Sequence, residues 1–142
     1  MNTFLPYSDF KKSAQCLDNK RLGKQRVEAY QILRVLLGYS DGWENHPAVK
    51  MWKGYESALA LYGLEICREW IGKNFKDTCT QKINDLVRVH KLNIKSPIYP
   101  FWFGQRDFHT TQKSNLLRKF PQHYSKFKWK EKNNLPYHWP VK

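Results

Sequence analysis

Apolar residues at helical spacing dominate the middle of this chain. They recur at alternating intervals of three and four, at Trp52, Tyr55, Leu59, Tyr62, Ile66 and Trp70. Because an α-helix turns about 100° per residue, this spacing places these side chains on one face. We predict a long amphipathic helix that follows the cap and proline of residues 45–47 and ends near Gly72. The aromatic stripe is interpreted as core rather than as a ligand site.

An earlier helix carries polar residues where a core-facing stripe is expected. We predict that it begins between Ser8 and Asp18, runs to Leu37 and stops at Gly38. Asp18 and Gln25 fall on the same stripe as its leucines. Burying ionised groups costs several kcal/mol unless they are paired. This half of the helix is therefore either a satisfied structural network or the wall of an active cleft.

Further charged residues surround that stripe. Arg21 and Glu28 flank it on one side and Arg26 flanks it on the other, while Lys20 and Lys24 point into water. Charged residues thus lie on both sides of the polar positions, which fits both a structural network and the wall of an active cleft.

The rest of the chain predicts two shorter helices and no strands. Apolar residues between positions 83 and 90 indicate a third helix, and a fourth begins with Asp107 as its cap and ends before Pro121. Residues 96–104 contain two prolines, so we predict an extended, packed loop there. The expected fold is mainly α: a compact single domain over residues 1–142, with about four helices, long packed loops and an aromatic and basic C-terminal tail.

The chain is strongly basic. Its 142 residues include 25 Lys and Arg against 12 Asp and Glu, which gives a formal charge of +13. Such an excess on a folded domain most often indicates a polyanionic partner. We therefore expect nucleic acid, with a merely soluble basic protein as the alternative.

The cysteines and the apolar runs argue against a disulfide-rich protein, a zinc protein and a membrane-spanning protein. Cys16, Cys67 and Cys79 are odd in number and lack the spacing of a zinc site, so we expect reduced, mostly buried thiols and no bound metal. No apolar run approaches the ~18 residues that span a bilayer, and the N-terminus has no signal-peptide core. We expect a monomer that is cytoplasmic, or located wherever nucleic acid is accessible, that is not secreted and that has no membrane partner.

Beyond Pro121, aromatic residues alternate with lysines, at Lys126, Phe127, Lys128, Trp129 and Lys130. Aromatic rings stack on exposed bases, and ammonium groups neutralise phosphates. The pattern therefore predicts a tail that binds nucleic acid. The alternative is a tail in which Phe127 and Trp129 pack on the core while the three lysines face solvent.

The fourth helix offers a second wall for a cleft. It carries four candidate lining residues, at His109, Gln112, Lys113 and Arg118. A lone histidine is weak evidence by itself, and it gains weight here because the charged residues of the first helix need an opposing wall.

These features resemble the pyrimidine dimer DNA glycosylases of the phage endonuclease V type, which are small all-α enzymes of nearly this length. The resemblance extends from end to end. It rests on the first-helix motif with Arg21, Arg26 and Val27, on residues 67–78, and on the aromatic and lysine-rich tail. Residues 17–22 and 45–49 indicate a distant sub-branch of the family.

The resemblance implies a mechanism that starts at the N-terminal amine. In that family the amine attacks C1′ of the damaged nucleotide, displaces the base and forms an imine, after which β-elimination cuts the strand. An α-amine is less basic than a lysine amine, so more of it is unprotonated at neutral pH. A first-helix glutamate assists, an arginine-lined cleft holds the phosphates, and one nucleotide leaves the stack.

Two positions depart from the family's pattern. The family exposes its amine by removing the initiator methionine ahead of a small residue, whereas Asn2 is bulky, so the amine belongs either to Met1 or to Asn2. The family's glutamate would align near residues 22 and 23, which carry no carboxylate. Asp18 and Glu28 are therefore the first-helix candidates for the catalytic acid.

The resulting expectation is a glycosylase for a damaged or modified base in double-stranded DNA. It would also have abasic-site lyase activity, and it would need neither metal nor organic cofactor. DNA-binding residues are expected in the fourth helix and the tail, as named above, and in the first helix at Arg21, Lys24, Gln25 and Arg26. The alternatives are a non-catalytic nucleic-acid-binding protein and an N-glycoside hydrolase that uses Asp18 or Glu28 with water.

Overall fold

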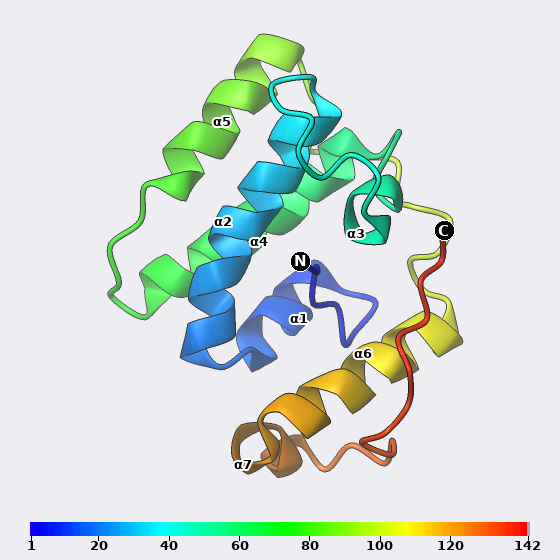
Figure 1. Cartoon of the computed structure of the whole chain (residues 1–142). Helices are drawn as coiled ribbons and strands as arrows, with labels where there is room; N and C mark the ends of the chain where they lie inside the picture. The colour runs from blue at the N-terminus through cyan, green and yellow to red at the C-terminus, as the bar shows by residue number, and fades with distance from the viewer. Residues whose placement is uncertain (142) are drawn as a thin grey trace.

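The computed structural model describes residues 1–141, and within that range it contains helices, turns and loops but no strand (Figure 1). The mainly α prediction is therefore confirmed. The helices are α1 (Phe10–Cys16), α2 (Asn19–Leu36), α3 (Pro47–Lys50), α4 (Glu56–Gly72), α5 (Cys79–His90), α6 (Arg106–Lys119) and α7 (Pro121–Tyr124), followed by the 3-10 turn η1 (Ser125–Phe127). The longest of them, α2, α4, α5 and α6, lie close to the four predicted positions, and the short α1, α3 and α7 add to these.

The predicted first helix is divided at Leu17 and Asp18. Leu17 has extended backbone angles (φ −69°, ψ 140°), and Asp18 follows as the N-cap of α2. The Asp18 carboxylate accepts the backbone N–H of Arg21 at 3.4 Å, which satisfies one of the free donors of the first helical turn. α2 then ends at Leu36, and Gly38 follows with a φ of +88°, which confirms the predicted stop.

The single helix predicted between residues 47 and 72 is interrupted. Gly54 has a φ of +87°, a conformation that glycine adopts without steric cost, and the chain turns there between α3 and α4. Trp52 lies in this turn but is fully buried, and its indole N–H donates to the Thr3 hydroxyl at 3.1 Å. The stripe is core as predicted, because Trp52, Leu59, Tyr62 and Ile66 are all buried.

The N-terminal segment lies between two groups of helices. α2 packs against α4, and α1 and α5 also contact α4, while α6 lies on the far side of α1 (Figure 1). Residues 2–6 are buried, and the C-terminal tail runs back along α6 toward α3 (Figure 1). The first residues of the chain are thus enclosed by α2, α6 and the tail.

Some finer predictions are corrected. The loop of residues 96–104 buries Trp102 completely but leaves Ile98 and Phe101 78% and 58% exposed, so it is packed only in part. Asp107 is not the cap of α6, because Gln105 occupies that position and Asp107 lies in the first turn. The three cysteines are buried and none forms a disulfide, as predicted.

Candidate functional site

Gln25 fixes the N-terminal segment to α2. Its side chain is fully buried, its Oε1 accepts the N–H of Phe4 at 3.0 Å and the hydroxyl of Tyr62 at 2.5 Å, and its Nε2 donates to the carbonyl of Asn2 at 2.8 Å. The same Nε2 lies 3.0 Å from Oε2 of Glu28. The polar residue on the core stripe of α2 is therefore part of a satisfied structural network. It faces the N-terminal segment rather than the surface.

Two of the α6 candidates hold this segment from the other side. Nε2 of His109 accepts the N–H of Gly104 at 2.9 Å, so Nδ1 carries the proton and donates to the carbonyl of Leu5 at 2.8 Å. Burial lowers the pKa of His109, which favours this neutral form. Oε1 of Gln112 accepts the N–H of Leu5 at 3.2 Å. Both side chains thus position residue 5.

A pocket of about 280 Å³ opens where the chain begins. It is lined by Met1, Asn2, Phe4, Lys20, Arg21, Lys24, Glu28 and Lys119. The backbone N–H of Asn2 donates to Oε2 of Glu28 at 3.4 Å. Glu28 is the carboxylate among these lining residues, and the other charged side chains are cations. Of the predicted catalytic residues, Met1, Asn2 and Glu28 are brought together here, with the predicted DNA-binding residues Arg21 and Lys24.

Lys119 is a site residue that the sequence analysis missed. It is the last residue of α6, and its Nζ lies 5.4 Å from the centre of the Phe4 ring. Burial and the neighbouring cations Arg21 and Arg118 lower the pKa of Lys119. Lys20 also lines the pocket, although it was predicted only to face water. Nothing in the local sequence around Lys119 signals this position, because it depends on how α6 packs against the N-terminal segment.

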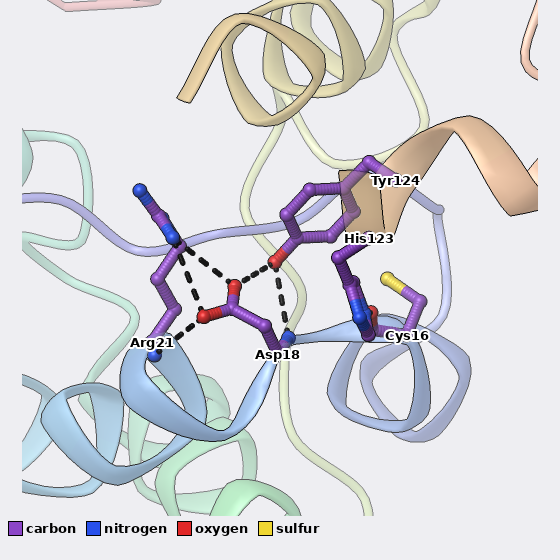
Figure 2. A network of polar contacts seen from close by, with 5 residues as sticks. All are labelled: Cys16, Asp18, Arg21, His123 and Tyr124. Carbon is purple, nitrogen blue, oxygen red and sulfur yellow. Dashed lines mark hydrogen bonds and ion pairs between the residues drawn. The ribbon is translucent and has the colours of Figure 1, made fainter. Parts of the chain in front are cut away.

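Asp18 lies outside this pocket and has structural partners (Figure 2). The Tyr124 hydroxyl donates to Asp18 Oδ1 at 2.5 Å, and Nη1 of Arg21 approaches the same oxygen at 3.2 Å. Burial alone would raise the pKa of Asp18, but these two partners lower it below its usual range. The contacts tie the start of α2 to α7.

Arg26 lies on the opposite flank of α2 and does not line the pocket. Its Nη1 pairs with Oδ1 of Asp77 at 2.5 Å, and its guanidinium lies 4.4 Å from the centre of the Trp70 ring. Burial opposes ionisation of Asp77, but hydrogen bonds from Thr80, Arg26 and Cys79 outweigh it and lower its pKa to about 2. Arg26 therefore joins α2 to the start of α5.

Arg118 and Lys113 hold the C-terminal tail. Arg118 donates to the carbonyl of Asn133 at 3.1 Å and to the side chain of Asn115, and Lys113 lies 3.8 Å from the carboxylate of Glu131. These contacts leave the tail folded along α6, as Figure 1 shows.

The two predicted tail aromatics are packed. The Trp129 ring stacks on Tyr124 at a centroid distance of 5.7 Å and on Phe127 at 5.4 Å, and its N–H donates to the Tyr7 hydroxyl at 2.8 Å. The lysines that alternate with these rings, Lys126, Lys128 and Lys130, are exposed. The rings therefore pack on the protein, as in the alternative given above. The lysines face solvent, where they are accessible to phosphates.

The comparison with protein families identifies the chain. The family model described as pyrimidine dimer DNA glycosylase matches residues 1–83, which is more than half of the chain and includes Met1 and Glu28. The protein therefore belongs to the pyrimidine dimer DNA glycosylase family. Neither the comparison with curated proteins nor that with solved structures gave a match. The extension of one glycosylase domain over residues 84–142 stays a prediction.

In the described part of the chain, residues 1–141, no helix combines the length and apolar character needed to cross a membrane.

Proposed function

We propose that this protein releases a base of the pyrimidine dimer class from double-stranded DNA and then cuts the abasic site through an imine on its N-terminal amine. The observation that carries this proposal is that the first residues and Glu28 line one pocket, whose other charged side chains are cations. A DNA glycosylase is what membership of the family implies. The formal charge of +13 fits a polyanionic substrate.

Either form of the N-terminus is compatible with this chemistry. With Met1 retained, its amine belongs to a residue that lines the pocket. With Met1 removed, the amine is the nitrogen of Asn2, which lies 3.4 Å from Oε2 of Glu28. A carboxylate at this distance can accept a proton from the attacking amine and stabilise the cationic sugar. Glu28 therefore supports the proposal better than Asp18, whose oxygens are occupied by Tyr124 and Arg21.

The reaction follows in two stages. The amine lone pair forms a bond to C1′ while the bond between C1′ and the base breaks, and the base leaves with that electron pair and takes up a proton. The sugar ring then opens to an imine. Loss of a proton from C2′ expels the phosphate at the 3′ carbon and cuts the strand. Lys20, Arg21, Lys24 and Lys119 would hold the phosphates beside the reacting sugar.

Borohydride trapping tests the proposal, because reduction makes the imine permanent and links protein to DNA. The purified protein is mixed with abasic, ultraviolet-irradiated and undamaged duplexes in the presence of borohydride. We expect covalent complexes with the first two and none with the third. Binding without any covalent complex would favour the non-catalytic alternative, and base release without one would favour a hydrolase that uses water.

A further inference from the structure

A second surface lies on the far flank of α2, around the segment of residues 67–78. α2 contacts this segment closely, since a Cβ added at Gly23 would lie 3.0 Å from the Trp70 ring. The Lys73 ammonium donates to the Asn19 side chain at 3.2 Å. None of the residues that line the pocket belongs to this segment.

Two aromatic side chains of this segment stack on each other, and Arg26 of α2 lies against one of them. The Trp70 ring has the Arg26 guanidinium 4.4 Å from its centre and stacks on Phe75 at a centroid distance of 4.2 Å. Its indole N–H donates to the carbonyl of Lys76 at 2.8 Å, which closes the loop over the ring. Phe75 is nevertheless 39% exposed. The fold therefore fixes an aromatic ring at the surface instead of burying it.

The charged residues that flank Phe75 most closely in the exposed part of the loop are lysines. Lys73 and Lys76 are exposed on either side of Phe75. The acid that follows them, Asp77, has a nearly fully buried side chain that is paired with Arg26. The loop thus presents an exposed ring that is flanked in the sequence by two exposed lysines, a combination that suits the sugars and phosphates of a nucleic acid backbone.

The pocket and this loop lie on the two flanks of one exposed ridge. At about 100° per residue, Lys24 and Glu28 of the pocket fall on one side of α2, and Asn19 and Gly23, which contact the loop, fall on the other. Val27, 41% exposed, lies on the ridge between them. A helix with its side chains is about 10–12 Å wide, so a duplex laid over this ridge can reach both flanks.

We propose that Lys73, Phe75 and Lys76 form a second DNA-contact surface, which holds the duplex on the side of α2 opposite the pocket. The two lysines bind phosphates, and the Phe75 ring packs against the deoxyribose between them. This inference rests on the proposed function, because it takes double-stranded DNA as the ligand. It adds a binding role for a segment outside the pocket.

The test measures the salt dependence of binding to a duplex that carries a stable abasic analogue unable to form an imine. Each lost phosphate contact makes the negative slope of log K against log salt shallower by about 0.9. The double variant Lys73→Gln/Lys76→Gln should therefore reduce the magnitude of the slope by about 1.8. Phe75→Gln should weaken binding by roughly fivefold with an unchanged slope, because it removes apolar contact and no charge. Circular dichroism checks that the variants remain folded.

A matched pair of exposed lysines outside residues 67–78, changed as Lys53→Gln/Lys91→Gln, serves as the control. The control should leave the slope unchanged. An unchanged slope in the Lys73/Lys76 variant, or an equal loss in both pairs, would overturn the inference while wild-type trapping still supports the glycosylase. A wild-type protein with flat salt dependence and no trapping would overturn the proposed function itself.

Discussion

The backbone N–H of Asn2 and the Glu28 carboxylate are joined by a hydrogen bond of 3.4 Å, and Gln25 donates to the same carboxylate oxygen at 3.0 Å. α2 therefore holds the beginning of the chain against an acid, at the edge of a pocket that Met1 also lines. A distant N-terminus would have favoured a protein that only binds nucleic acid. The proposed amine chemistry requires the first residue to lie beside the acid at an open pocket, because the nucleophile must come within about 3–3.5 Å of the sugar carbon.

Replacing Glu28 by glutamine should separate chemistry from binding. Glu28→Gln keeps an acceptor for Gln25 and Asn2 but removes the proton-accepting carboxylate, so single-turnover base release should fall about 100-fold or more. Affinity for the duplex should change less than about threefold, because the cations of the pocket are untouched. Single-turnover assays at saturating protein and binding titrations measure the two effects. A variant with the wild-type rate of base release would show that Glu28 is structural.

Asp18 should behave in the opposite way. Asp18→Ala removes the N-cap of α2 and leaves the Tyr124 hydroxyl and Arg21 without their partner. Lost caps and unpaired buried groups each cost about 1–3 kcal/mol, so the free energy of unfolding should fall by roughly 3 kcal/mol. Base release by the folded fraction should be retained. Urea denaturation and activity below the melting temperature test this, and a stable but inactive variant would instead make Asp18 the catalytic acid.

The Asp77 carboxylate, which accepts hydrogen bonds from Thr80, Arg26 and Cys79, should make the stability of the protein sensitive to acid. The folded-state pKa of Asp77 is lowered from 3.8 to about 2, so its contribution is complete above about pH 5 and is lost as the pH falls through 2. The shift corresponds to about 2 kcal/mol. Urea denaturation between pH 5 and pH 2 should show this loss in the wild type and a smaller loss in Asp77→Asn. Parallel pH curves for the two proteins would contradict the assignment.

The four long helices could be predicted because apolar periodicity records which face of each helix is buried. The interruption at Gly54 could not, since a glycine inside a periodic run fits both a helix and a left-handed turn. The cap at Asp18 was misread as a residue of the helical stripe, because capping depends on one local conformation and not on spacing.

The residues of the site could be predicted only where they lie close together in the sequence. Arg21, Lys24 and Glu28 belong to one helix, and the expected proximity of the N-terminus to them came from the family resemblance. The partners of Arg26 and Lys119 come from distant segments: Asp77 is 51 residues from Arg26, and Lys119 reaches Phe4 across most of the chain. Sequence spacing does not indicate such contacts, so neither the pairing of Arg26 with Asp77 nor the place of Lys119 in the pocket was predicted, and a DNA-binding role for Arg26 stays a prediction.

The tail should respond differently to loss of a ring and to loss of charge. Trp129→Ala removes the stacking on Tyr124 and Phe127 and should lower the free energy of unfolding by about 2 kcal/mol, because the ring is partly buried. Changing Lys126, Lys128 and Lys130 together to glutamine should leave stability unchanged but make binding less dependent on salt. Thermal denaturation and salt titrations distinguish the effects. A triple variant with the wild-type salt slope would remove the tail from the DNA interface.

The identity of the cross-linked residue shows which nitrogen of the protein forms the imine. The complex trapped by borohydride on an abasic duplex is digested with protease, and mass spectrometry locates the sugar remnant on the peptides. We expect the remnant on the α-amine of the first residue, Met1 or Asn2. Acetylating this amine beforehand should abolish that adduct while salt-sensitive binding persists. A remnant found only on a lysine side chain, or an unchanged rate of base release after acetylation, would contradict the proposed amine mechanism.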